Sequence, residues 1–104
     1  MLRQLRLTRM DAITDALKTV IDPDIGINIV DLGLVETVDD SAEPVTIGLV
    51  MTSPACPQAG YIADQCGEVL AALGIRAEIS VLDDPPWQPG RMSATARAAL
   101  GWDE

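Results

Sequence analysis

Apolar residues repeat at helical spacing in two segments of the chain. Residues three and four positions apart share one helix face. The first repeat therefore predicts a helix from about Thr8 that ends before Pro23, with an inner face made of Met10, Ile13, Leu17 and Val20. The second predicts a helix from Pro57 to about Leu73, stopped by Gly74, with an inner face made of Ala59, Ile62, Cys66, Val69 and Leu73.

Three shorter apolar segments, at residues 34–38, 45–51 and 77–81, predict strands. Residues 39–44 are polar and few enough for a hairpin, so we expect the first two strands to be antiparallel. The strand-helix-strand unit that follows is expected to cross over right-handed, which makes the second and third strands parallel. Ser93 then caps a short final helix.

The order α-β-β-α-β-α predicts the fold class. We expect an α/β (α+β) two-layer sandwich with a small mixed three-stranded sheet. A length of 104 residues fits one compact domain, which we place at residues 8–104 after a short N-terminal arm at residues 1–7.

The acidic composition and the absence of histidine exclude several functions. The chain has 16 Asp and Glu against 7 Lys and Arg, a net charge of −9, so we expect no nucleic-acid partner. Without histidine, Ser-His-Asp and Cys-His catalysis are excluded. No apolar run reaches the ~20 residues that span a bilayer, so we expect no membrane partner. Two cysteines make no disulfide framework, and we expect a cytoplasmic protein with reduced thiols.

Cys56 is the residue that most directly suggests chemistry. It directly precedes the predicted second helix, where the helix dipole and unpaired first-turn amides favour a thiolate. We therefore interpret Cys56 as a reactive thiol rather than as a small buried hydrophobe. Cys66 falls on the inner face of the same helix, and ten helical residues span ~15 Å, so it is interpreted as a core residue that cannot bridge Cys56.

Polar residues in two loops are candidates for a pocket around this thiol. They are Asp22, Asp24 and Asp31 before the first strand, and Thr52 and Ser53 after the second. If the first two strands pair, the loop at residues 22–31 can lie near the end of the second strand, and carboxylates and hydroxyls would then flank the thiolate. For any one of them, turn formation and satisfaction of local amides is the simpler role.

A proline-rich segment after the third strand suggests a second surface. Its candidate partner-binding residues are Pro85, Pro86, Trp87, Pro89 and Arg91. The segment is expected to be either a recognition patch or lid beside the cysteine, or a hydrophobic plug over an open sheet edge.

Three motifs resemble one known family. They are DPDIGINIVDLGLV at residues 22–35, MTSPACP at residues 51–57 and DPPWQPGRMS at residues 84–93. The chain resembles SufT and PaaD-type iron–sulfur cluster assembly factors, whose domain also occurs at the N-terminus of Mrp-type carrier ATPases. The resemblance implies a two-layer α/β fold and a role without a catalytic reaction. It places the family's reactive cysteine on Cys56 and its surrounding pocket on Asp22, Asp24, Ile25, Thr52 and Ser53.

The leading hypothesis is a non-catalytic factor for iron–sulfur cluster assembly or delivery. Its partners would be the assembly machinery and client apo-proteins, and Cys56 would be the contact to iron or to a transient cluster. A cluster takes four ligands, so either a homodimer supplies two Cys56 thiolates, or a partner or small thiol completes the shell. The alternatives are a thiol-dependent redox enzyme and a cysteine-independent adaptor that binds through residues 85–89.

Overall fold

The computed structural model describes residues 8–52 and 58–101 and confirms the predicted order of elements. The helices are α1 (Arg9–Leu17), α2 (Ala59–Ala71) and α3 (Ala94–Ala99), and a 3-10 turn, η1 (Pro89–Arg91), precedes α3. The strands are β1 (Val35–Asp39), β2 (Val45–Leu49) and β3 (Ala77–Val81). The third strand has the predicted bounds, and the second is two residues shorter than predicted.

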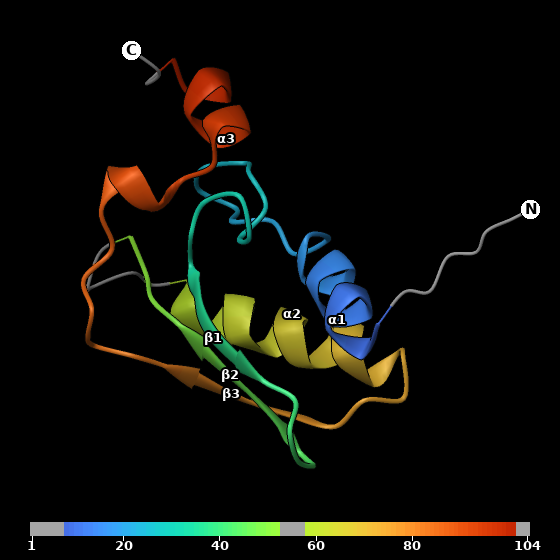
Figure 1. The fold of residues 1–104 in the computed structure, drawn as a ribbon. Coiled ribbons are helices and arrows are strands. Elements are labelled where there is room, and N and C mark those ends of the chain that lie inside the picture. The colour runs from blue at the N-terminus through green and yellow to red at the C-terminus, as the bar shows by residue number, and fades with distance from the viewer. Residues whose placement is uncertain (1–7, 53–57, 102–104) are drawn as a thin grey trace, which may run out of the picture.

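The three strands form one mixed sheet in the order β1-β2-β3. β1 is antiparallel to β2, and β3 is parallel to β2, with Ile47 opposite Ile79. Figure 1 shows α1 and α2 together on one face of this sheet, which makes the predicted two-layer sandwich. The core between the layers is aliphatic, and its largest fully buried side chains include Ile13, Leu34, Ile47, Leu49 and Ile62.

Helix α1 begins as the sequence predicts and ends earlier. Thr8 caps it in a capping box, in which its hydroxyl accepts from the amide of Asp11 and the Asp11 carboxylate accepts from the amide of Thr8. The helix ends at Leu17, so Val20 reaches the core from the following turn. Met10 is 36% exposed, because the first turn extends past the edge of the core.

The predicted inner face of α2 is only partly correct. Ile62 and Cys66 are buried as expected, but the third buried position is Leu70. Leu73 is 51% exposed because α2 ends at Ala71, and the chain leaves the helix axis before Leu73. Gly74 has a φ of +77°, the left-handed conformation that commonly follows a helix end.

Candidate functional site

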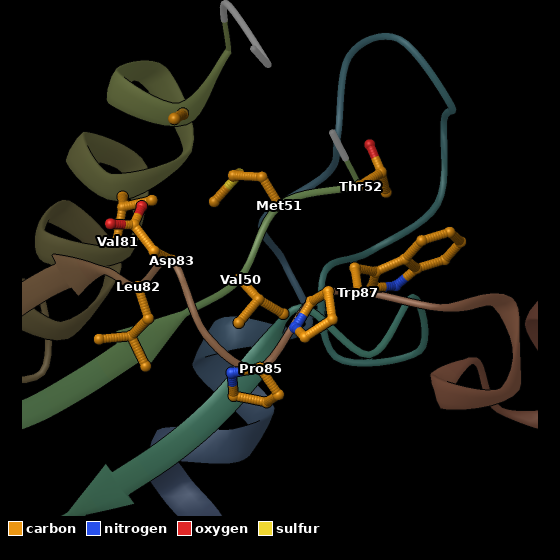
Figure 2. Close-up of a pocket in the computed structure, with 10 residues that line it drawn as sticks. Val50, Met51, Thr52, Val81, Leu82, Asp83, Pro85 and Trp87 are labelled. Carbon is orange, nitrogen blue, oxygen red and sulfur yellow. The ribbon is translucent and has the colours of Figure 1, made fainter. Parts of the chain in front are cut away.

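The clearest pocket lies where the two parallel strands end. It has a volume of about 350 Å³ and is lined by three segments: the residues that follow β2, the start of α2 and the residues that follow β3 (Figure 2). The lining residues are Val50, Met51, Thr52, Ala59, Val81, Leu82, Asp83, Pro85, Pro86 and Trp87. Ligand pockets in α/β sheets commonly lie at the carboxyl ends of the strands, beside a helix N-terminus.

Four of the predicted site residues line this pocket. They are Thr52 from the second motif and Pro85, Pro86 and Trp87 from the third. Cys56 and Ser53 lie outside the described residues. The pocket wall is mainly apolar, and Thr52 and Asp83 bring the hydroxyl and the carboxylate to it.

Asp22 and its neighbours form a tight turn that does not line the pocket. Asp22 is only 2% exposed, and its Oδ1 accepts a hydrogen bond of 2.9 Å from the amide of Asp24. The Asp22 carbonyl accepts from the amide of Gly26 at 2.7 Å, where φ is +84°. Asp24 is exposed and Ile25 packs against the core. These contacts are the turn chemistry that the sequence offered as the simpler role.

Asp31 also makes local contacts. Its Oδ2 accepts a hydrogen bond from the side-chain Nδ2 of Asn28 at 2.7 Å, and its backbone N–H donates to Asn28 Oδ1 at 2.9 Å. The Asp31 carbonyl accepts from the amide of Ser93, the residue that caps α3. Asp31 thus joins the loop before β1 to the start of α3.

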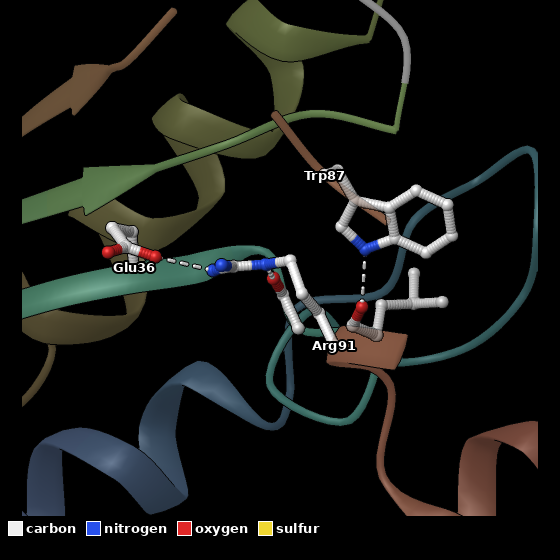
Figure 3. Close-up of polar contacts among 5 residues, drawn as sticks. Glu36, Trp87 and Arg91 are labelled. Carbon is white, nitrogen blue, oxygen red and sulfur yellow. Dashed lines mark hydrogen bonds and ion pairs between the residues drawn. The ribbon is translucent and has the colours of Figure 1, made fainter. Parts of the chain in front are cut away.

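The proline-rich segment is fixed to the loop before β1. Trp87 donates its indole N–H to the Leu32 carbonyl at 2.7 Å, and Arg91 donates to the Gly33 carbonyl at 2.8 Å and to Glu36 at 2.6 Å (Figure 3). Of the predicted partner surface, Pro85, Pro86 and Trp87 form one wall of the pocket, whereas Pro89 and Arg91 belong to η1, away from it. Trp87 is half-buried against the core, which favours a packed wall over a free recognition patch.

The described residues at the start of α2 supply no side-chain cap. Gln58 occupies the N-cap position and makes no capping hydrogen bond, and the first turn carries no acidic residue. The first turn itself therefore supplies no negative side chain to the positive end of the helix dipole at Ala59, and Asp83 is the acidic residue that lines the same pocket. This end of α2 forms part of the pocket wall.

Cys66 is fully buried, as predicted, and burial raises the pKa of its thiol to about 12. Cys66 is therefore a core residue, as the sequence predicts. Among residues 8–52 and 58–101, no group of three or more Cys, Asp or Glu side chains is arranged to hold a metal ion. In the same residues, no helix has the length and hydrophobicity that would let it cross a bilayer.

Sequence reasoning missed most of the pocket wall. Val50, Val81, Leu82 and Asp83 were not predicted as site residues because each is an ordinary residue for a strand end, and Met51 was noted only as the first residue of the MTSPACP motif. The available signal was topological: a predicted parallel pair joined by a helix places both carboxyl ends and the helix start together. That rule points to residues 50–52 and 82–83.

Comparison with known proteins places the chain among iron–sulfur assembly proteins. The family model described as "Iron-sulfur cluster assembly protein" matches residues 10–81. The Fe-S protein maturation auxiliary factor YitW of Bacillus subtilis is 40% identical over 92 residues, which cover 86% of this chain and 90% of that protein. The corresponding factor SufT of Staphylococcus aureus is 42% identical over 85 residues, covering 79% of this chain and 97% of that protein.

A solved structure agrees in fold. The crystal structure of a domain of unknown function from Bacillus anthracis has a TM-score of 0.80 and 39% identity, and the match covers 88% of this chain and 90% of that one. The family model covers well over half of the chain, and two relatives match over most of their own length. The chain therefore belongs to the iron–sulfur cluster assembly protein family.

Proposed function

We propose that this chain is an auxiliary factor for the maturation of iron–sulfur proteins, in which Cys56 transiently contacts iron, a cluster or a client cysteine at the pocket. Two similar proteins carry the name Fe-S protein maturation auxiliary factor, which supports the general role. The iron or cluster is cargo in this proposal. The protein acts without catalysing a reaction of its own, in the cytoplasm, with assembly machinery and apo-proteins as partners.

The position of the pocket is the observation that supports this role for Cys56. Thr52 and Ala59 both line it, and Cys56 is three residues from Ala59 along the chain. Consecutive Cα atoms are 3.80 Å apart, so the Cα of Cys56 lies within about 11 Å of the Cα of Ala59 along any path. Cys56 precedes Gln58 and Ala59 by only two and three residues, which supports a role for its thiol at the pocket and the start of α2.

The same helix start supports an ionised sulfur. The first-turn amides and the positive end of the helix dipole, with no acidic side chain in the first turn of α2, favour a thiolate over a thiol. A thiolate binds iron, attacks electrophilic sulfur and exchanges with other thiolates, all of which suit transfer of cargo. Asp83 and Thr52 add two oxygen donors at the pocket wall.

One thiolate leaves most of the coordination sites of a cluster to other donors. We propose that these sites are filled by a partner chain, a client or a second copy, and that the small donor number allows release. The neutral, buried Cys66 takes no part.

Anaerobic reconstitution with ferrous iron and sulfide tests this proposal. We expect the parent protein to bind iron and to gain visible absorption, and Cys56→Ser to lose both. Cys66→Ala is the matched control, because it removes the other thiol of the chain and Cys66 does not line the pocket, and it should bind iron like the parent. Equal iron binding by the parent and Cys56→Ser would show that Cys56 is not the contact.

A further inference from the structure

Among the described residues, β3 is an edge strand of the sheet. The Leu82 amide donates to the Leu49 carbonyl at 2.7 Å, and the Arg76 carbonyl accepts from the Val45 amide at 2.9 Å. The backbone N–H and C=O groups of the even-numbered residues of this segment therefore point towards β2. Backbone groups alternate in direction along a strand, so the N–H and C=O groups of the odd-numbered residues, Ala77, Ile79 and Val81, point away from the sheet. Within the described residues, no strand lies on that side.

The other edge strand, β1, carries features that hinder strand addition. β1 has a register irregularity between Val35 and Thr37, and its Glu36 is paired with Arg91. Bulges and charged residues are devices that block strand addition at an edge. β3 keeps an unbroken register with β2 over its five residues, contains no proline, and has Glu78 as its one charged residue. It is the edge better suited to accept another strand.

A groove runs beside β3 along α2. Ala63, Gly67 and Ala71 are spaced four residues apart on α2, and they line a cavity of about 450 Å³ with Ile79 of β3. A neighbouring cavity shares Gly67 and Ala71 and extends to Glu78. The small side chains leave space between helix and strand, so residues of an added strand could enter it.

The rim of this groove is acidic. Asp64 and Glu68 line the first cavity, and Glu78 lines the second. Asp64 and Glu68 are exposed on α2, whereas the exposed Glu78 side chain points to the sheet face opposite Ile79, so the carboxylates beside the groove are those of Asp64 and Glu68. Arg76 is the basic residue at the far end. Lysine and arginine side chains fit such a groove, because their stems cover apolar surface while their charged heads reach carboxylates.

We propose that the groove between α2 and β3 binds an extended segment of a partner polypeptide that carries Lys or Arg side chains and adds to β3 as a fourth strand. Main-chain hydrogen bonds to Ala77, Ile79 and Val81 supply affinity, and the acidic rim selects basic side chains. A second copy of this chain is a poorer occupant, because its net charge is also −9 and the same carboxylates would face one another.

Gly67→Leu tests the groove without disturbing the fold. A Cβ on Gly67 meets no atom within 4 Å, so leucine enters the groove without a clash. It also replaces a helix-interior glycine by a good helix former. Gly60→Leu is the matched control, since a Cβ there is equally unobstructed and Gly60 lines neither cavity. Both variants keep the parent's net charge, so non-specific attraction of a basic probe is unchanged.

The probe is a fluorescein-labelled peptide of alternating lysine and valine, compared with one of alternating glutamate and valine, in an anisotropy titration. We expect the lysine peptide to bind the parent and Gly60→Leu equally, and Gly67→Leu to lose about tenfold or more in affinity. The double variant Asp64→Asn, Glu68→Gln should weaken binding of the lysine peptide by roughly fivefold at low salt. The double variant Asp15→Asn, Asp40→Asn is its control: it changes the net charge equally and should leave binding unchanged.

Three results would overturn the proposal. They are equal binding of both peptides, unchanged binding by Gly67→Leu, and a dimer of the parent that Gly67→Leu converts to monomer, which would make a second copy the occupant. None of these measurements involves Cys56, so the inference and the proposed function can fail separately.

Discussion

At the scale of single residues, the fully buried Cys66 sets a pH limit on the stability of the fold. Burial raises the pKa of its thiol to about 12, so the folded state keeps the thiol neutral. The unfolded chain ionises the same thiol near its ordinary pKa. The contribution to stability is therefore complete below that ordinary value and is lost as the pH rises towards the folded value.

We predict a steeper alkaline loss of stability for the parent than for Cys66→Ala. Urea unfolding at about pH 8 and about pH 10.5 measures it, since the other titrating groups are common to both proteins. The difference in unfolding free energy between the two proteins should shrink or reverse at the higher pH. A constant difference would mean that the Cys66 thiol ionises equally in both states.

Residue-level reasoning from the sequence succeeded where a residue's role depends on its own helix or turn. The Thr8 capping box, the Ser93 cap and the buried Cys66 follow from local spacing. The roles of the polar candidate residues were predicted less completely. Asp22 and Asp31 bond within their own loops, which no feature of the sequence distinguishes from a role beside a thiol.

At the scale of elements, the loop before β1 and the 3-10 turn η1 are in close contact through Gly33. A Cβ on Gly33 would lie 2.4 Å from the carbonyl oxygen of Arg91, and Gly33 has a φ of +79°. Any other residue there meets both a backbone clash and left-handed strain. This contact, together with the Arg91 hydrogen bonds, holds the proline-rich segment in place.

Gly33→Ala should therefore destabilise the fold more than Gly26→Ala. Gly26 has a similar φ of +84° but no atom within 4 Å of its Cβ position, so alanine there adds about 1 kcal/mol of strain alone. Gly33→Ala should cost about 2 kcal/mol more, because η1 must move. Chemical denaturation compares them, and equal losses would mean that the contact between the loop and η1 adds nothing to stability.

Order and topology were predictable at this scale because each element carries its own periodicity. The hairpin, the parallel β2–β3 pair and the final helix follow from spacing and turn residues. The attachment of residues 85–91 to the loop before β1 was not predictable. It depends on Trp87 and Arg91 meeting backbone carbonyls more than fifty residues away, at Leu32 and Gly33.

At the scale of the whole molecule, two features lie on different parts of one acidic protein. The pocket at the carboxyl ends of β2 and β3 accommodates the proposed thiol chemistry, and the groove between α2 and β3 accommodates a basic segment. β3 borders both, since Val81 lines the pocket and Ile79 lines the groove. A partner strand on β3 would thus run towards the pocket.

The dependence of client maturation on Cys56 tests the central claim most directly. The gene is deleted in the source organism, and the deletion strain is complemented with the parent, Cys56→Ser or Cys66→Ala at matched protein levels. The measurement is the activity of a [4Fe–4S] dehydratase per unit of dehydratase protein. We predict that the parent and Cys66→Ala restore activity and that Cys56→Ser stays at the level of the deletion. Full restoration by Cys56→Ser would contradict the account.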